Sequence, residues 1–250
     1  MTILERLAAL QESGGRAVLF TVLEGEGAGE KLLVVEGGDT VGDGPTELAG
    51  RADEILRAGR NTLLDADGTR VFAEWYGPPP RLLVYGAVDT AEALCAAAKL
   101  LGWETIVADA RAKFATRDRM PSADELIVAW PDEALAQVAP DHQTAVVVLT
   151  HDDKFDEPAL QGALGTEAFY IGALGSRRNQ ERRRERLLAA GVAQEDLARV
   201  SGPCGLDIGA DTLEETALSI LAEILAVRAR RSGGRLKESP QRIHAEASVS

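Results

Sequence analysis

The stretch Phe169–Leu188 reads FYIGALGSRRNQERRRERLL, and the interpretation of the whole chain depends on it. The apolar run over residues 169–173 predicts a short strand, which we expect to break at Gly172 and Gly175 before a helix begins. Ser176 then stands in the cap position of that helix. A strand that passes through glycines into a capped helix directs unpaired backbone N–H groups and the positive end of the helix dipole to one point. Such a turn is typical of an anion site in an α/β protein.

Arginine dominates this predicted helix. The arginines stand at Arg177, Arg178, Arg182, Arg183, Arg184 and Arg186. Only Glu181 and Glu185 oppose them, in a chain whose net charge is −13, so the segment reverses the sign of the charge locally. One interpretation is an anion pocket, most simply for phosphate, at the Gly175–Arg178 turn. The other is a solvated helix face with pairs such as Arg177–Glu181, which we favour for residues 182–186.

Composition narrows the class of protein. A chain of 250 residues with 45% hydrophobic content can bury a core and suggests one large or two modest domains. It has no apolar run near the roughly 20 residues of a membrane helix, and MTILERLAALQ at the start is a short amphipathic segment rather than a signal peptide. Cys95 and Cys204 stand far apart without a partner motif, which predicts neither a disulfide framework nor a zinc site. We therefore expect a soluble, cytoplasmic protein with no membrane partner, and the acid excess argues against nucleic acid.

Residues 1–78 alternate strand-like and turn-like pieces. We expect strands over 17–23, 31–35, 61–64 and 69–76, and a helix over 46–59. The last two strands form a hairpin around Asp65–Gly68. This pattern predicts a small N-terminal α+β domain. Gly77–Pro80 follows as a stiff linker, because consecutive prolines stay extended.

Residues 79–230 change to regular strand–helix alternation, which predicts a Rossmann-like parallel-sheet domain covered on both faces. The expected strands cover 81–85, 104–109, 125–130, 144–150 and 169–173, and the expected helices 90–101, 131–138, 157–164 and the arginine helix. A final helix begins at a capping box of Thr212 and Glu215. Residues 231–250 have no periodicity, and we expect a disordered tail.

Ligands of parallel sheets bind beyond the carboxyl ends of the strands, where this chain brings four loops. The first loop, residues 86–91, reads GAVDTA where a dinucleotide fold keeps G-x-G-x-x-G, so only Gly86 remains of the three glycines. Asp109 ends the next strand, at the position that would meet a ribose hydroxyl. Both NAD(P) binding and a scaffold without tight nucleotide binding remain open.

The other loops carry further candidates. His151 and Asp152 follow the most apolar strand, where a histidine beside acids could act as acid, base or ligand, or could simply be solvated. Residues 202–210 read GPCGLDIGA, and a glycine-rich loop entering a helix suits close approach to a ligand or serves as a turn. Cys204 within it is either an exposed thiol or a small buried hydrophobe, and we favour the second.

Four segments together resemble a known family. YIGALGSRRNQERRRERL, GLDIGADTLEETALSILAEILAVR, THDDKFD and GWETIVADAR are similar to the XdhC/CoxI family over about residues 81–230. These xanthine dehydrogenase accessory proteins bind molybdenum cofactor and help it to mature and enter the target enzyme. Two places depart from the family pattern: the first loop reads GAVDTA where relatives often have GAGHVG, and Gly37-Gly38-Asp39 is the nearest trace of a GGC-type segment.

The resemblance implies a maturation chaperone that is not itself an enzyme and has no catalytic residues or metal ligands of its own. It implies transient binding of molybdenum cofactor (molybdopterin) while the sulfido ligand is installed. The implied partners are the apo-enzyme of a molybdenum hydroxylase and a cysteine desulfurase, and a homodimer is compatible with the pattern. The cofactor-binding residues would be Gly86, Asp109, His151, Asp152, Gly172, Gly175, Ser176, Arg177, Arg178, Gly205, Asp207 and Gly209.

Two other functions remain as alternatives on the same fold. One is an NAD(P)-dependent oxidoreductase, which would need the pyrophosphate turn that this chain has largely lost. The other is a nucleotide-sensing regulatory module that signals through residues 1–78. A titration with nicotinamide dinucleotides separates the first from a chaperone, and nucleotide-dependent association separates the second.

Overall fold

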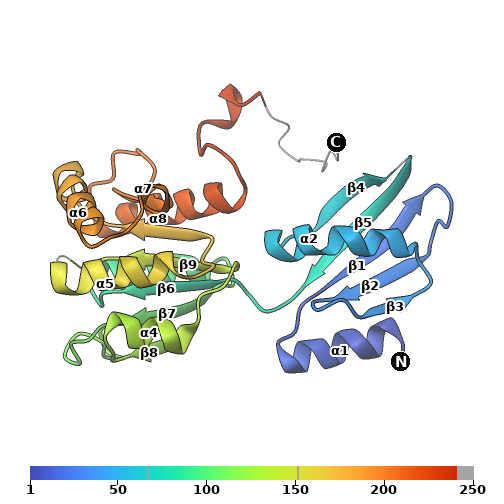
Figure 1. Ribbon diagram of the computed structural model, residues 1–250, viewed down its shortest axis with the longest axis horizontal. Helices are drawn as coiled ribbons and strands as arrows, with labels where there is room; N and C mark the ends of the chain where they lie inside the picture. The colour runs from blue at the N-terminus through green and yellow to red at the C-terminus, as the bar shows by residue number, and fades with distance from the viewer. Residues whose placement is uncertain (67, 151, 241–250) are drawn as a thin grey trace. The chain divides into compact units, whose positions relative to one another are not determined.

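The computed structural model describes residues 1–66, 68–150 and 152–240, which form two compact units (Figure 1). The first unit comprises residues 1–78, with residues 234–240 grouped beside them, and the second comprises residues 79–233. The boundary between Pro78 and Pro79 lies inside the segment that the sequence predicts as a linker. Each unit has its own sheet and its own core, so each is described separately.

The first unit is built on an antiparallel sheet of order β3-β2-β1-β5-β4. Its strands are β1 (Ala17–Glu24), β2 (Lys31–Val35), β3 (Thr40–Gly42), β4 (Thr62–Ala66) and β5 (Thr69–Tyr76). The predicted hairpin is confirmed, since β4 and β5 pair antiparallel with Asp65 opposite Arg70. The sequence analysis missed β3, because three residues of which only Val41 is even half-buried carry no alternation to detect.

Helices cover both faces of this sheet. On one face, Val18 and Phe20 of β1 pack in one apolar cluster with Ile55 of α2 (Ala52–Ala58). On the other face, Leu19 packs with Leu10 of α1 (Ile3–Ser13). The predicted single helix over residues 46–59 is wrong: a 3-10 helix, η1 (Thr46–Arg51), precedes α2. Gly50 lies in η1 just before the junction, and glycine is a poor residue for the interior of an α-helix.

The second unit is a six-stranded sheet in which all neighbours are parallel, in the order β11-β10-β9-β6-β7-β8. Its strands are β6 (Arg81–Tyr85), β7 (Glu104–Ala108), β8 (Glu125–Ile127), β9 (Thr144–Val148), β10 (Tyr170–Ala173) and β11 (Val200–Ser201). Its helices are α3 (Asp89–Lys99), α4 (Pro131–Val138), α5 (Asp153–Leu164), α6 (Arg177–Ala189), α7 (Gln194–Leu197) and α8 (Leu213–Arg228). Numbered from β6, this is the 3-2-1-4-5-6 order of dinucleotide-binding sheets. The predicted Rossmann-like class is confirmed.

Alternate residues of the buried strands serve opposite faces of this sheet. Leu82 and Val84 of β6 pack in one cluster with residues of α3 and α8. Leu83 and Tyr85 pack in another with residues of α4, α5 and α6. Burying a leucine such as Leu82 fully contributes about 1.5–3 kcal/mol. This two-sided burial explains why the strands read as continuous apolar runs.

Two boundaries differ clearly from the sequence prediction, and two short elements were missed. Helix α5 begins at Asp153 rather than 157, a turn earlier, so Pro158 lies inside the helix and not in its first turn, where proline is best tolerated. Strand β8 ends at Ile127, and Trp130 instead caps α4 ahead of Pro131 at the first helical position. The sequence analysis missed α7 and β11, which are too short to show a period.

The segment after α8 was predicted to be a disordered tail. Within it the structure describes residues 231–240, which include one 3-10 turn, η2 (Leu236–Glu238). Residues 241–250 lie outside the described residues. In the part of the chain that is described, no helix combines the length and the apolar character that crossing a bilayer requires.

Candidate functional site

The topological switch point of the sheet lies between β6 and β9. The chain leaves β6 for β7 and β8 on one side and returns through β9 to β10 and β11 on the other. The loops after β6 and β9 meet there, and a Cβ on Gly86 would lie 2.9 Å from Cγ2 of Thr150. Gly86 also has a φ of +111°, which favours glycine. Gly86 is therefore required both by its backbone conformation and by the close contact between the loops after β6 and β9.

The backbone amides of the first loop are already used within the chain. Gly86 N–H donates to the Ala108 carbonyl at 2.8 Å, and Val88 N–H donates to the Gly86 carbonyl at 2.9 Å. Ala87 N–H donates to Oδ2 of Asp109 at 3.0 Å. In a dinucleotide site these amides would face the pyrophosphate. Here these amides donate to acceptors within the protein instead.

Asp109 is buried and is held by Arg111. Arg111 donates to Oδ1 from its backbone N and from Nε, both at 2.9 Å, and to Oδ2 from Nη2 at 2.8 Å. Burial raises the pKa of the Asp109 carboxyl, but the hydrogen bonds from Arg111 and Ala87 outweigh it and hold the pKa below its usual value. A carboxylate with these partners has little capacity left for a ribose. Its predicted ligand role remains a prediction, which this arrangement does not favour.

The start of α3 adds to the same conclusion. Its first turn carries Asp89 and Glu92, and the capping position, Val88, supplies no side-chain hydrogen bond. Asp89 pairs with Arg119 at 3.0 Å. Acidic side chains already complement the positive end of this helix dipole, so they oppose a phosphate there. The first loop and α3 together therefore weigh against a nicotinamide dinucleotide bound in the usual manner.

The turn after β10 has the opposite character. The Ser176 hydroxyl caps α6 by accepting a hydrogen bond from Asn179 N–H at 3.2 Å. The first amides of a helix have no acceptor within it, which leaves those of Arg177 and Arg178 available. Gly175 has a φ of +137°, and the turn needs glycine there. Both arginine side chains are exposed, and neither forms an ion pair within the described ranges. The structure thus brings four of the predicted residues together as a turn with free donors.

Gly172 differs from the prediction. The strand does not break there: β10 continues through Gly172 to Ala173. A Cβ on Gly172 would lie 2.6 Å from a ring carbon of Tyr170, so the glycine makes room for that aromatic ring. It is buried inside the sheet and lies before the turn rather than in it.

Arg183 contradicts the interpretation of residues 182–186 as a solvated face. It is 5% exposed and donates from Nη2 to Oδ2 of Asp156 at 2.6 Å and to the Leu174 carbonyl at 3.2 Å. Thr150 donates its hydroxyl to the other oxygen of Asp156. A buried network therefore ties the loop after β9 to the turn after β10. The reason is positional: residue 183 lies on the same stripe of α6 as Leu187, which packs in the core.

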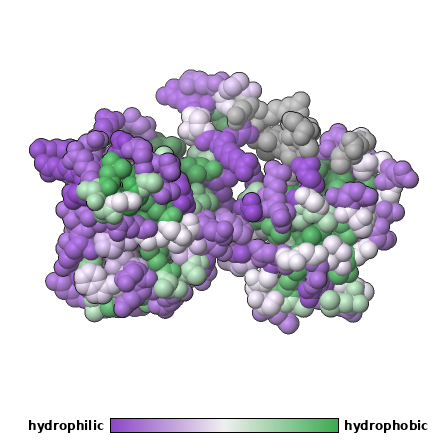
Figure 2. All heavy atoms as spheres, in the orientation of Figure 1, coloured by the Kyte–Doolittle hydropathy of each residue, from purple (hydrophilic) through white to green (hydrophobic). Residues whose placement is uncertain are grey.

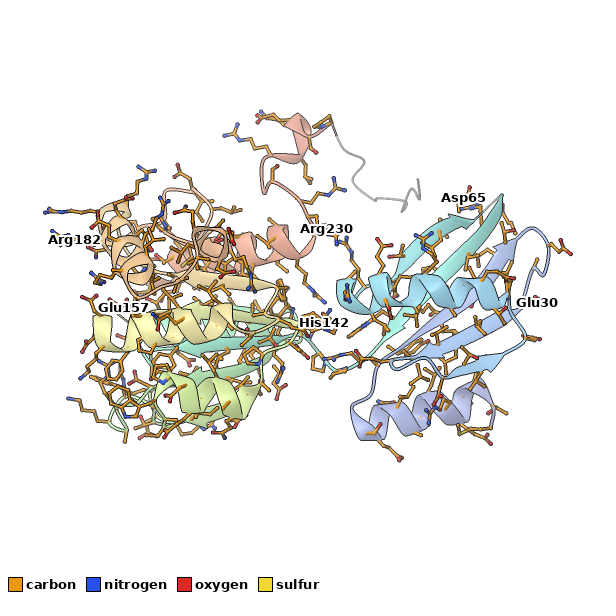
Figure 3. The ribbon with its side chains drawn as sticks, in the orientation of Figure 1. Glu30, Asp65, His142, Glu157, Arg182 and Arg230 are labelled. Atoms are coloured by element: carbon orange, nitrogen blue, oxygen red, sulfur yellow. The ribbon has the colours of Figure 1, made fainter. Side chains whose placement is uncertain are left out.

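The remaining arginines of α6 divide into two groups. Arg186 faces α5, where it pairs with Asp153 at 2.6 Å and with Glu157. Arg182 is exposed on the outer side of the helix, as the label in Figure 3 shows. In the space-filling view, hydrophilic side chains surround a small hydrophobic patch in this part of the second unit (Figure 2). For Arg182 the solvated-face interpretation stands.

A pocket of about 400 Å³ opens along the flank of α6. The residues of α6 that line it are Arg177, Gln180, Glu181, Arg183, Arg184 and Leu187. Leu197, Val200, Gly202 and Pro203 form the facing wall. The sequence analysis missed this pocket and the position of Arg184 in its lining. The available signal was the spacing of 177, 181 and 184, which places those side chains on one stripe of a helix.

The loop after β11 is held against α8. Gly205 N–H donates to Oε2 of Glu223 at 2.8 Å, and a Cβ on Gly205 would lie 2.5 Å from the Ser219 hydroxyl. Asp207 and Gly209 are exposed. Cys204 is buried, and burial, reinforced by the charge of Glu223, raises the pKa of its thiol to about 12. The interpretation of Cys204 as a small buried residue is confirmed.

The loop after β9 carries two of the predicted site residues. His151 lies outside the described residues, so its predicted role stays a prediction. Asp152 caps α5 by accepting from Lys154 N–H at 3.2 Å, and its other carboxylate oxygen lies 3.8 Å from Lys154 Nζ. Within residues 1–66, 68–150 and 152–240, no three His, Cys, Asp or Glu side chains gather where they could hold a metal ion.

The comparisons with known proteins bear on the second unit above all. A family model described as the XdhC Rossmann domain matches residues 82–224. The chain is 34% identical over 162 residues to a Bacillus subtilis protein named as a probable subunit of xanthine dehydrogenase, covering 65% of this chain and 47% of the relative. It is 31% identical over 157 residues to the molybdenum cofactor insertion chaperone PaoD of Escherichia coli, covering 63% and 43%.

Among solved structures, a Bacillus halodurans protein described as a xanthine dehydrogenase superposes with a TM-score of 0.68 and 28% identity. That match covers 91% of this chain and 67% of the other. The chain spans less than half the length of the curated relatives that it matches. The family match covers more than half of the present sequence and includes the turn after β10. The chain therefore belongs to the XdhC family.

Proposed function

We propose that this chain binds molybdenum cofactor as a cargo and delivers it to the apo-enzyme of a molybdenum hydroxylase of the xanthine dehydrogenase type. In this proposal the chain is a carrier without catalytic residues of its own. The cargo is held while its sulfido ligand is installed, so a cysteine desulfurase is the second expected partner. The similarity to a named insertion chaperone supports the class of function.

The observation that carries the proposal is the turn after β10. Molybdenum cofactor is a pterin with a terminal phosphate, so a carrier needs donors for an anion beside a space for a ring. Free amides at the start of α6, the dipole of a helix of 13 residues and two arginines without ion-pair partners in the described chain all favour negative charge at this point. The 400 Å³ pocket adjoins them at Arg177.

The experiment compares two double variants of the full chain. Protein is purified anaerobically under reducing conditions from cells that make the cofactor, and molybdenum and pterin are measured in the product. Arg177→Ala with Arg178→Ala should lose most of both, because a charge-assisted hydrogen bond contributes about 1.5–3 kcal/mol, or roughly ten- to a hundredfold in affinity. Arg182→Ala with Arg230→Ala removes the same charge from exposed positions (Figure 3) and should retain the cargo.

The outcome also separates this function from the oxidoreductase alternative. Parent protein that carries neither molybdenum nor pterin, but quenches the fluorescence of NADH or NADPH stoichiometrically, would contradict the proposal. The amide hydrogen bonds of the first loop and the acids at the start of α3 lead us to expect no such binding.

A further inference from the structure

The pocket beside α6 contains a residue that phosphate binding alone does not explain. Arg177 lies at one end of the pocket, at the N-terminus of the helix, where an anion is favoured. Glu181, one turn further along the same wall, is a carboxylate. In a pocket that held only an anion, this charge would weaken binding. Its presence calls for a ligand with a second, different part.

Glu181 is free to accept hydrogen bonds. It is exposed and forms no ion pair with Arg177 or with any other residue that the structure describes. A carboxylate is an acceptor with two oxygens and matches two parallel N–H donors on a ligand. Arg184, less than one turn beyond it, presents a planar array of donors that can bind a carbonyl oxygen or stack on a ring.

The dimensions and the facing wall suit an elongated ligand with a flat end. Arg177 and Leu187 are ten residues apart on α6, so the lined groove extends about 15 Å at 1.5 Å per residue. The wall opposite Glu181 and Arg184 includes Leu197, Val200 and Pro203, which offer apolar surface to a ring. Arg183, which also lines the pocket, is held by its buried ion pair with Asp156.

We propose that this pocket binds phosphate monoesters of flat heterocycles whose ring edge carries adjacent N–H donors beside a carbonyl. Arg177 and the first amides of α6 hold the phosphate, Glu181 accepts from the ring N–H groups, and Arg184 donates to the carbonyl. A 2-amino-4-oxopyrimidine edge has this pattern, and both guanine and a pterin contain it. The inference rests on the proposed function for the identity of the natural cargo, but the pocket is tested without that cargo.

Calorimetric titration of the full chain with three stable probes tests the assignment. Guanosine monophosphate has the phosphate and the donor edge, adenosine monophosphate has the phosphate with a different edge, and inorganic phosphate has no ring. We expect guanosine monophosphate to bind about tenfold or more tightly than either of the others, since a site built to pair donors rejects a ligand that lacks them. Equal affinity for the two nucleotides would overturn the ring part of the proposal.

Glu181→Gln gives the sharpest result because the two interpretations predict opposite signs. If Glu181 accepts from the ring, the variant should bind guanosine monophosphate about tenfold more weakly and inorganic phosphate no less tightly than the parent. If Glu181 is only a repulsive charge, both probes should bind more tightly, which would sink the proposal. Glu185→Gln is the matched control, since Glu185 is exposed on the same helix and does not line the pocket.

The arginines complete the test. Arg177→Ala should weaken all three probes, and Arg184→Ala should weaken guanosine monophosphate alone. Arg182→Ala, on the outer side of α6, should leave the affinity for all three probes unchanged. A loss there equal to that of Arg177→Ala would show general attraction by the helix and overturn the site.

Cargo retention separates this inference from the proposed function. If Glu181→Gln loses its nucleotide preference but keeps molybdenum and pterin, the carrier function stands and the pocket does not read the cargo's ring. If the parent shows the nucleotide preference but carries no pterin, the carrier function fails and the pocket stands.

Discussion

Two turns of one sheet, after β6 and after β10, each lead a parallel strand into a helix through a glycine with positive φ. After β6, the amide of Ala87 is bonded to Asp109, and the helix begins with two acids. After β10, Ser176 caps the helix and the next two residues are arginines without ion-pair partners in the described chain. The same strand–glycine–helix turn therefore has its amide bonded within the protein after β6, whereas after β10 its donors are available to a ligand.

The two turns differ in whether their backbone amides are available to a ligand. A helix N-terminus attracts negative charge wherever its dipole is not already complemented. Asp109, Asp89 and Glu92 supply that complement at the first turn. At the second turn the chain supplies positive charge instead, and the proposed function places the phosphate of the cargo there. Four variants test this contrast.

Asp156→Ala should have the largest effect, because it removes the buried partner of Arg183, which donates to the Leu174 carbonyl in the turn after β10. Its carboxylate and the Arg183 guanidinium are both almost fully buried. Leaving that arginine uncompensated should cost about 3–5 kcal/mol of unfolding free energy, measured by urea denaturation. Arg182→Ala, one residue away on the exposed face, should change stability by less than about 0.5 kcal/mol. Equal losses in the two variants would mean that burial does not distinguish these arginines.

Asp109→Asn should have the next largest effect, at the turn after β6. Losing charged hydrogen bonds to Arg111 should cost about 1.5–3 kcal/mol. Because the folded pKa of Asp109 lies below its ordinary value of 3.8, the stabilisation is complete above that value. It is lost as the pH falls through the lower folded pKa, so the difference between parent and variant should shrink in acid. A difference that stayed constant to the lowest pH at which the fold survives would contradict a role for the charged carboxylate.

Ser176→Ala should cost about 1 kcal/mol, the usual contribution of a helix cap. Ser176→Gly should cost only a few tenths of that amount. If the hydroxyl serves only as the cap that accepts from Asn179 N–H, neither variant should change the affinity for inorganic phosphate by more than about twofold. A large loss of phosphate binding with stability intact would show that the hydroxyl contacts the ligand directly.

Asp89→Asn should have the smallest effect. The pair of Asp89 with Arg119 is exposed, and such pairs contribute about 0–1 kcal/mol. The variant should also gain no phosphate binding, because Asp109 still occupies the Ala87 amide. Tight phosphate binding in the double variant Asp89→Asn with Arg177→Ala would contradict this view. It would show that side-chain charge alone, and not the hydrogen bonding of the backbone amides, separates the two turns.

Local patterns predicted much of the fold and part of the site. Continuous apolar runs such as residues 144–148 identified buried strands, and the capping box at Thr212 and Glu215 located the start of α8, which the structure confirms. Ser176 was correctly identified as a cap. These features depend on residues within one strand or one turn of helix, so the sequence contains all the information that they need. Residues 46–59 show the limit, because helical spacing could not reveal the change from a 3-10 helix to an α-helix after Arg51.

Consecutive residues were enough to specify the class of the sheet, the family, and the turn where glycine, cap and arginine coincide. They could not specify which of the arginines of α6 is buried, which faces the pocket and which is solvated. Arg182, Arg183 and Arg184 are adjacent in the chain, and a helix turns by about 100° at each residue. The environment of each arginine depends on residues of other elements. Asp156 pairs with Arg183, and Leu197 and Pro203 line the pocket together with Arg184. The roles of neighbouring identical residues therefore depended on long-range packing, which no local pattern records.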